Sequence, residues 1–222
     1  MKKFELTTEF ITNAFGKKLF RIKALIDFGD VKAGELGGYV EKEGNVSQNG
    51  DAWVYGNAWV YGNAKVYDDA WVHGNAKVFD NAEVSGDAKV YGNARVSGDA
   101  RVYGDAWACG NAWVRGNARV YGDARVSGNA WVSGNARVSG NAWVSGDADY
   151  ALVQGFGTEF RCTTFYRGKN KKIMVNCGCF HGDLEGFRKQ VKETRNGKIA
   201  KEYLMIADLM EYHFTSEDSS DE

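Results

Sequence analysis

The 222-residue sequence contains no proline, although average usage of about 5% would give roughly eleven. Because proline lacks a backbone N–H, its absence alongside 28 glycines indicates a backbone whose N–H groups are nearly all needed in hydrogen-bonded ladders. The chain also lacks an excess of charge: 28 Lys and Arg residues against 29 Asp and Glu residues give a net charge of -1. This balance excludes a protein that binds nucleic acid through bulk positive charge. The hydrophobic fraction of 44% is enough for a sizeable core.

Long apolar runs are also missing. No stretch approaches the ~18 consecutive apolar residues of a membrane span, and the start MKKFELTTEF contains no apolar run that could act as a signal peptide. We therefore expect a cytoplasmic protein with no membrane partner. The four cysteines, without an export signal, fit reduced thiols better than a disulfide framework.

A six-residue repeat, Gly-(Asn/Asp)-Ala-x-Val-x, fills residues 50–145. Valine recurs every six residues from Val54 to Val144, with Ala108 as the one break, and an alanine stands two residues before each of these positions. Because six is a multiple of two but not of 3.6, the alanines and valines would share one face of a strand. Gly followed by Asn or Asp tolerates left-handed backbone angles, so each hexad predicts a very short strand and a corner. Such strands need stacked neighbours, as in solenoids.

The corner residues indicate how many hexads make one coil. Taken every eighteen residues, five of the seven corner aspartates fall in one column, whose members are Asp51, Asp69, Asp87, Asp105, Asp123 and Asn141. A three-sided coil of eighteen residues predicts this segregation, whereas a two-sided coil would mix the columns. The hexads would then make about five coils, roughly 25 Å long at 4.7–4.9 Å between strands.

The repeat resembles that of the hexapeptide-repeat proteins, whose fold is a left-handed parallel β-helix. The segment 19–47, which contains FGDVKAGELGGYVE, also resembles the lead-in of a family of phage, prophage and bacterial hexapeptide-repeat proteins. The resemblance implies a mainly β fold, a single-stranded left-handed β-helix shaped as a triangular prism. Members of this family are often labelled as transferases or polymer-forming proteins, labels that rest on the repeat itself.

Both ends of the β-helix should be capped, because exposed strand edges promote endless stacking. Residues 1–49 would form an N-terminal β cap, containing a hairpin, and the first coil; residues 50–154 would form the repeat β-helix. The alternating runs TEFRCTTFY and KKIMVNCGCF then predict a hairpin, and two amphipathic helices should follow. We expect residues 155–215 to form a ββαα C-terminal domain and residues 216–222 to form an acidic disordered tail.

The outward positions of the repeat carry the main functional indication. When the outward positions are grouped at intervals of eighteen residues, one coil apart, the first face carries Trp53, Trp71, Lys89, Trp107, Arg125 and Trp143. The second face carries Trp59, Lys77, Arg95, Trp113 and Trp131. The third face carries Lys65, Glu83, Arg101, Arg119 and Arg137, beside Tyr67, Ser85, Tyr103, Tyr121 and Ser139. Such ladders suit stacking on bases, phosphate contacts or a protein partner. The alternative is that large side chains only cover the Ala-Val strands.

The candidate binding residues are therefore taken from the third and the first face. They are Lys65, Tyr67, Arg101, Tyr103, Arg119, Tyr121, Arg137, Trp53, Trp71, Trp107 and Trp143.

Other residue patterns favour structural roles over chemistry. His73 is the only histidine in the coils, and a zinc site needs at least three protein ligands, so an ordinary surface histidine is favoured over a catalytic base. Cys177, Cys179 and His181 suggest a metal site, with Cys162 expected on the same face across the hairpin. The same alternation would align Phe160, Ile173 and Val175 with these cysteines, so buried structural thiols are favoured. For the aspartate column, corner chemistry is favoured over a bound cation.

Three classes of function remain. The favoured one is a non-enzymatic binding protein, with no cofactor or metal, that presents its Trp/Arg/Tyr ladders to a host protein or protein–nucleic acid complex. The resemblance to phage-encoded relatives implies counter-defence inhibition as its setting. The alternatives are a trimeric acyltransferase-like enzyme that uses His73 or His181 at a subunit cleft, and a structural element that assembles with itself. We also expect a homo-oligomer, formed through the C-terminal domain or a face of the β-helix.

Overall fold

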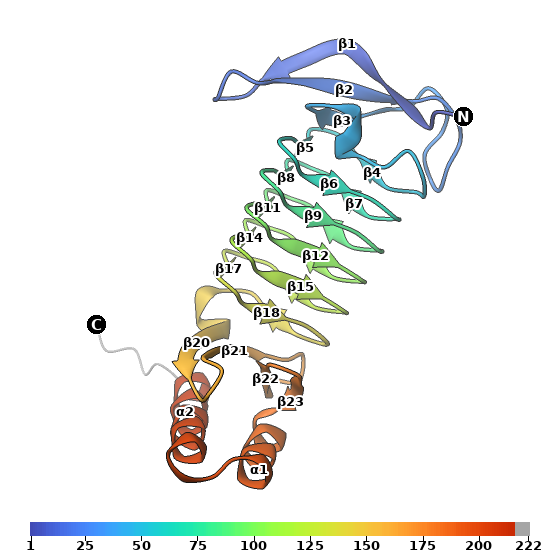
Figure 1. The fold of residues 1–222 in the computed structure, drawn as a ribbon. Helices are drawn as coiled ribbons and strands as arrows, with labels where there is room; N and C mark the ends of the chain where they lie inside the picture. Colours follow the sequence, from blue (N-terminus) through green and yellow to red (C-terminus); the bar gives the residue numbers. More distant parts are fainter. Residues whose placement is uncertain (216–222) are drawn as a thin grey trace.

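The computed structural model describes residues 1–215, in which a parallel β-solenoid of about six turns lies between two capping units (Figure 1). The predicted disordered tail, residues 216–222, lies outside the described residues. Each turn contributes one short strand to each of three sheets. Successive strands in a sheet are eighteen residues apart, as in the pairs of Trp53 with Trp71 and Arg119 with Arg137. The prediction of a three-walled coil of eighteen residues is confirmed.

The three sheets correspond to the three faces identified in the sequence. The first face consists of β4 (Trp53–Val54), β7 (Trp71–Val72), β10 (Lys89–Val90), β13 (Trp107–Ala108), β16 (Arg125–Val126) and β19 (Trp143–Val144). The second consists of β5 (Trp59–Val60), β8 (Lys77–Val78), β11 (Arg95–Val96), β14 (Trp113–Val114) and β17 (Trp131–Val132). The third consists of β6 (Lys65–Val66), β9 (Glu83–Val84), β12 (Arg101–Tyr103), β15 (Arg119–Tyr121) and β18 (Arg137–Val138).

The interior is a continuous column of alanine and valine side chains. Those of the repeat from Ala52 to Val144 are between 0% and 2% exposed, as is Ala108 at the valine break. Small side chains suit this narrow interior, because three walls converge on it. At the corners, most glycines adopt a positive φ; at Gly86 a Cβ atom would lie 2.9 Å from the backbone nitrogen of Gly104 in the next coil. The repeat therefore needs glycine where successive corners stack closely.

Two corners contain aspartate where the others have glycine. Asp68 and Asp80 have φ values of 58° and 62°, and their carboxylates accept hydrogen bonds from the backbone N–H groups of Gly86 and Gly98, at 3.2 Å each. Aspartate is one of the few residues besides glycine that tolerate the left-handed region, and here each carboxylate also bonds to the next coil.

The N-terminal cap begins with the predicted hairpin, β1 (Phe4–Thr12) and β2 (Lys18–Ala24). It continues through β3 (Leu36–Val40), which pairs parallel to β5. The 3-10 turn Glu43–Asn45 follows, and Val46 pairs with Val66. In both pairings the partners are twenty residues apart, two more than in the repeat, because Val46 and Val54 are separated by eight residues in place of six. They add one turn to the five made by the hexads.

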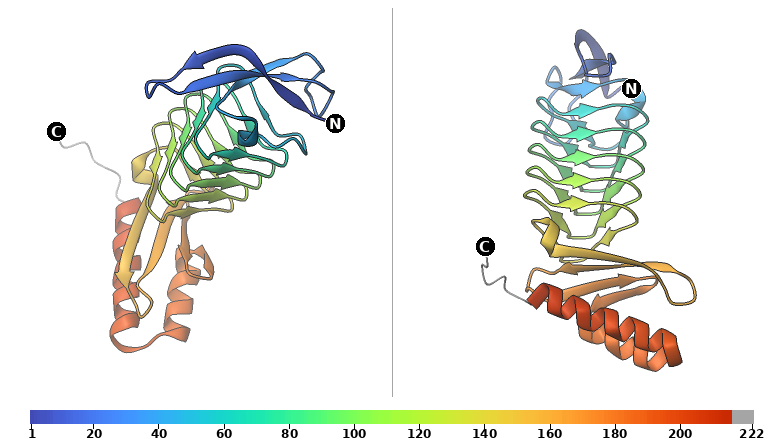
Figure 2. Two further views of the ribbon diagram at one scale, coloured as in Figure 1. Left: turned by 45° about the horizontal axis from the view of Figure 1, so that its top comes forward. Right: turned by 90° about the vertical axis from the view of Figure 1, so that its left-hand side faces the viewer.

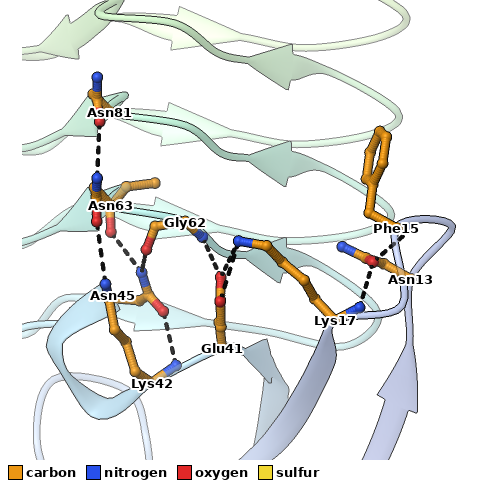
Figure 3. Close-up of polar contacts among 10 residues, drawn as sticks. Asn13, Phe15, Lys17, Glu41, Lys42, Asn45, Gly62, Asn63 and Asn81 are labelled. Carbon is orange, nitrogen blue, oxygen red and sulfur yellow. Dashed lines mark hydrogen bonds and ion pairs between the residues drawn. The ribbon is translucent and has the colours of Figure 1, made fainter.

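Side chains from the cap bond to the exposed edge of the first full coil. Lys3 Nζ donates to the carbonyl oxygens of Gly50 (3.0 Å) and Ala52 (2.9 Å). Asn45 Nδ2 donates to those of Gly62 (3.2 Å) and Ala64 (2.8 Å), as Figure 3 shows for Gly62. These bonds satisfy carbonyl groups that an open strand edge would leave unpaired.

The C-terminal unit contains twice as many strands as the predicted ββαα arrangement. After the 3-10 turn Asp147–Asp149, an antiparallel sheet forms from β20 (Tyr150–Phe156), β21 (Arg161–Arg167), β22 (Ile173–Cys177) and β23 (Phe180–Asp183). The predicted hairpin is β21–β22, and the sheet begins at Tyr150, ahead of the expected boundary at 155. The helices α1 (Leu184–Thr194) and α2 (Gly197–Thr215) lie on the side of this sheet away from the solenoid (Figure 2).

The C-terminal sheet covers the last coil in the same manner as the N-terminal cap covers the first. Thr164 Oγ1 accepts from the backbone N–H of Arg137 at 3.0 Å, and Asn176 Nδ2 donates to the Arg137 carbonyl at 2.8 Å. Side chains from both caps therefore occupy the edges on which further coils would stack.

Candidate binding surfaces of the solenoid

On the first and second faces, cationic side chains lie over tryptophan rings. Lys77 Nζ is 3.9 Å from the ring centroid of Trp59, and the Arg125 guanidinium carbon is 4.2 Å from that of Trp107. The Arg115 guanidinium carbon lies 4.3 Å from the centroid of Trp131. Each contact is a cation–π interaction, worth about 0.5–1 kcal/mol at exposed sites. The positive charges of these faces are thus already engaged with neighbouring rings.

Aromatic side chains in the same column also stack on one another. The ring pairs Tyr103–Tyr121, His73–Tyr91 and Trp113–Trp131 have centroids 4.9–5.1 Å apart and planes within 11° of parallel. Because the rings are stacked at the coil spacing, members of a pair cover one another's faces. A nucleic-acid base that stacked between them would have to separate the pair. These contacts favour the interpretation of the ladders as cover for the strands, and they leave ring edges for a partner.

Trp53 is not an outward binding residue, contrary to the prediction. It is fully buried, with its ring centroid 5.3 Å from that of Phe28 and 5.8 Å from that of Phe4, both in the N-terminal cap. The cap folds over the first face at the first coil, which the repeat pattern alone does not indicate. Further along this face, Trp71 and Trp107 are half-buried and Trp143 is 47% exposed.

The third face differs from the other two, because it carries no tryptophan. We call its cations Lys65, Arg101, Arg119 and Arg137 the basic stripe; all four are exposed. Arg101 Nε lies 3.3 Å from Glu83 Oε2, the one carboxylate in this column. Arg119 and Arg137 are direct neighbours in the sheet, and within residues 1–215 neither guanidinium makes an ion pair or a cation–π contact. The stripe therefore holds positive charge that the fold leaves uncompensated.

Tyrosines accompany the basic stripe. Tyr103 and Tyr121 stack in parallel, and the pKa of Tyr103 is raised by burial and by Tyr121, while nearby arginines oppose the rise. Tyr67 lies in the same column, with its hydroxyl 3.4 Å from Glu83 Oε2. The structure thus brings together the predicted third-face residues in two parallel columns.

A groove of about 620 Å³ runs along the corner between the third and first faces. Its walls include the five corner aspartates, four side chains of the first face and the cap loop at Gly29 and Asp30; the first-face members are Trp71, Lys89, Trp107 and Arg125. A second hollow continues it toward Trp143 and Lys169. The contributions of the cap loop and of Lys169 were not predicted, since they depend on how the caps dock.

The aspartate column lacks the side-chain ladder found at the other corners. Asn75, Asn93 and Asn111 are linked by Nδ2-to-Oδ1 bonds of 3.1–3.3 Å, whereas carboxylates cannot donate to one another. Positive charge from Lys89 and Arg125 in the groove offsets part of the repulsion. Within residues 1–215, no group of three or more His, Cys, Asp or Glu side chains is placed to hold a metal ion.

The predicted shared face of the cysteines is wrong. Arg167 pairs with Ile173, so the hairpin loop has five residues, and this odd number places Thr163 opposite Cys177. Cys162 therefore points to the other side of the sheet, where its thiol donates to the Asn135 carbonyl at 3.5 Å and burial raises its pKa.

The structure also shows where Phe160 and His73 lie, two residues considered above in connection with a metal site and a catalytic base. Phe160 is 66% exposed with a φ of 47°, so it does not lie on the apolar face with Cys177. His73 stacks on Tyr91, and burial together with the charge of Lys89 lowers its pKa.

Comparison with known families supports the solenoid. A family model described as the YdcK beta solenoid repeat matches residues 58–74, 88–104, 94–110, 118–134 and 130–146. No curated protein matches the sequence significantly. None of the helices within residues 1–215 combines the length and apolar character needed to cross a membrane.

Proposed function

We propose that the protein is a binding scaffold whose solenoid presents the basic stripe of its third face to an acidic surface on a macromolecular partner. The observation that carries this proposal is the uncompensated charge of Arg119 and Arg137. Cations on the other two faces lie over tryptophan rings, whereas Arg119 and Arg137 are paired residues of neighbouring strands and make no such contact. Paired residues of neighbouring strands are about 4.8 Å apart at the backbone, so two like charges on them repel each other. An acidic partner would remove this repulsion.

Rigidity supports the same proposal. The third face is backed by fully buried valines and alanines, and backbone hydrogen bonds run from coil to coil, as from Arg101 N to the Ala118 carbonyl at 2.9 Å. A backbone that is already ordered loses less conformational entropy when the protein binds a partner, and Arg and Tyr are enriched among residues that dominate interfaces.

A protein partner is favoured over free nucleic acid. The aspartate column borders the same face across the Tyr103–Tyr121 column, and tight nonspecific binding to nucleic acid depends on phosphate neutralisation over a long track. An acidic patch or segment of a protein needs to match only the stripe itself. From the resemblance to phage and prophage relatives, we place this binding in a host cell, with counter-defence inhibition as its setting.

Two observations bear on the alternatives. The acyltransferase-like alternative needs a histidine oriented by a partner group. Within residues 1–215, His73 stacks on Tyr91 and the exposed His181 lies against Gly140, and neither ring is bonded to a carboxylate. The self-assembling alternative needs open coil ends, and side chains of both caps bond to the terminal coils. Both observations favour the binding scaffold.

The test compares two triple variants with the same change in charge. Arg101→Glu, Arg119→Glu and Arg137→Glu together reverse the basic stripe; the matched control on the second face is Lys77→Glu, Arg95→Glu and Arg115→Glu. Partners are captured from host lysate, with and without nuclease, and quantified by mass spectrometry.

We expect the third-face variant to lose the main captured protein and the control to keep it. Circular dichroism and thermal melting establish that both variants remain folded. Equal retention by both variants, or equal loss, would eliminate the basic stripe as the binding site.

A further inference from the structure

The turn between β22 and β23 carries two cysteines separated by one glycine. Cys177 ends β22 and pairs with Phe180, which begins β23, so Gly178 and Cys179 alone make the turn. Cys177 is half-buried and packs against the core between the C-terminal sheet and its helices. Cys179 is exposed, contrary to the expectation of buried thiols. The turn therefore combines one accessible sulfur with one that is sheltered.

The geometry of the turn permits a bond between the two sulfurs. Cα atoms two residues apart are joined by two steps of about 3.8 Å, and a tight turn brings them to about 5.5 Å, inside the range of about 4.4–6.8 Å for disulfides. Gly178 supplies the positive φ, 62°, of such a turn. Both cysteines line one cavity of about 60 Å³, so they face a common space. A disulfide between them needs side-chain rotation and little movement of the backbone.

Positive charge surrounds this cavity. Arg161 and Arg195 line it together with one carboxylate, that of Glu159. The guanidinium of Arg161 lies over Gly178, where a Cβ atom would collide with it. Both arginines are exposed, and within residues 1–215 neither guanidinium forms an ion pair. Reactive cysteines are typically found in partly exposed surroundings of positive charge, and such surroundings attract anionic reactants.

Hydroxyl groups surround the sheltered sulfur. Thr163 Oγ1 donates to Cys177 Sγ at 3.1 Å. Tyr203 donates its hydroxyl to the Phe156 carbonyl at 3.3 Å, and burial together with the nearby sulfur of Cys177 raises the pKa of this tyrosine. Cys177 is thus held in place within the cavity, while Cys179 faces the solvent.

We propose that Cys177 and Cys179 form a thiol–disulfide exchange site for an anionic disulfide of low molecular weight, such as oxidised glutathione. The thiolate of Cys179 attacks one sulfur of the reactant, whose S–S bond breaks; a mixed disulfide forms on Cys179 and one thiolate leaves. The thiolate of Cys177 then attacks the Cys179 sulfur, and the second thiolate leaves. The protein loses two electrons and two protons, and the reactant takes up both as it becomes two thiols.

The disulfide formed in this way should be easily reduced again. A bridge across a single residue closes a small, strained ring, and strained or exposed disulfides are the labile ones. The site would therefore exchange oxidising equivalents with small thiols and would not serve as a structural cross-link. The inference does not rest on the proposed function, because the cavity lies on the side of the C-terminal sheet that faces α1, away from the solenoid (Figure 2).

Alkylation of the full-length protein, first reduced and then exposed to oxidised glutathione, tests the site. We expect two thiols to become protected, with a loss of two hydrogen atoms in the intact mass, and peptide sequencing to place the link between Cys177 and Cys179. Cys177→Ser should stop at the mixed disulfide on Cys179. Cys179→Ser should react at least about tenfold more slowly, because its remaining sulfur is sheltered. Cys109→Ser is the matched control and should react as the wild type does.

A second comparison tests the charge of the reactant. Arg161→Gln together with Arg195→Gln should slow the reaction with oxidised glutathione several-fold, most strongly at low salt, and leave the reaction with neutral hydroxyethyl disulfide unchanged. The control with the same loss of charge is Lys65→Gln together with Arg119→Gln, two exposed positions on the third face of the solenoid. It should react with both disulfides at the wild-type rate.

The outcomes are distinct. A protein whose four thiols all stay open to alkylation overturns the proposal, as does a disulfide that maps to other cysteines or joins two chains. A double-arginine variant that reacts with oxidised glutathione at the wild-type rate overturns the choice of an anionic reactant. Because Cys179 is exposed, its serine variant keeps the test valid if Cys177→Ser fails to fold.

Discussion

Replacing one carboxylate of the aspartate column should stabilise the protein. Asp105 has Asp87 and Asp123 as its neighbours, one coil away on either side. At about 4.8 Å each pair repels by about 0.9 kcal/mol in water, and salt at 0.15 M reduces the sum of the two to about 1 kcal/mol. Asp105→Asn removes this repulsion and adds an amide donor, comparable with the 3.0 Å bond from Asn81 Nδ2 to Asp99 Oδ1. The new amide bond should add about 1 kcal/mol to the free energy of unfolding.

The expected gain is therefore about 1–2 kcal/mol, or roughly 2–8 °C in melting temperature for a chain of this size. Thermal unfolding by circular dichroism at low and high sodium chloride measures it, and the gain should be larger at low salt. Asn93→Asp is the matched control, because it removes the 3.1 Å bond to Asn111 and adds a charge to a neutral column. It should destabilise the protein by a similar amount.

A destabilised Asp105→Asn variant, or a gain that salt does not change, would refute this reasoning. Either result would mean that the carboxylates of the column are held by stronger attractions than Lys89 and Arg125 supply.

Three further predictions concern the caps. Burial lowers the pKa of Lys3 from 10.5 to about 8, so the unfolded chain binds more protons above pH 8, and stability should rise by about 2 kcal/mol between pH 8 and 10 in urea titrations. Lys3→Met should abolish that rise in stability. A rise of the same size in the variant would show that another group causes it. Asn176→Ala removes the buried amide that bonds to the Arg137 carbonyl and should cost about 2 kcal/mol in the same assay; an unchanged midpoint would show that water replaces the amide. Trp53→Ala should cost about 3–5 kcal/mol and Trp143→Ala less than about 1 kcal/mol, and equal losses would contradict the buried position of Trp53.

The walls of the solenoid were predictable because the repeat is strictly local. The period of six sets which residues face inward, and the column of corner aspartates sets the number of walls, as the pair of Trp53 with Trp71 confirms. Every coil repeats the same contacts, so a pattern in the sequence maps directly onto a column in space. The membership of all three faces followed from this alone.

The caps were less predictable, because they depend on contacts between distant segments. Trp53 matches the repeat, yet Phe4 and Phe28 bury it from segments that lie far away in the sequence. Ala148 continues the alanine series, so the sequence pattern does not indicate that the C-terminal sheet already begins at Tyr150. The orientation of Cys162 depends on whether a hairpin loop has four or five residues.

The candidate site shows the same division. Its residues could be assigned to faces from spacing, but the difference between the faces depends on what each cation contacts. Spacing already puts Lys77 one coil from Trp59 and puts Arg119 on a face without tryptophan, but only the structure shows that the Lys77 ammonium lies over the Trp59 ring.

The most direct test of the binding scaffold observes the guanidiniums themselves. Arginine Nε–Hε signals in nitrogen-15 NMR spectra can be followed while the captured partner is titrated into the protein. We predict that the signals of Arg101, Arg119 and Arg137 shift or broaden, while those of Arg95, Arg115 and Arg125, which lie over tryptophan rings, stay in place. Shifts confined to the tryptophan-bound arginines, with the third-face signals unmoved, would contradict the account.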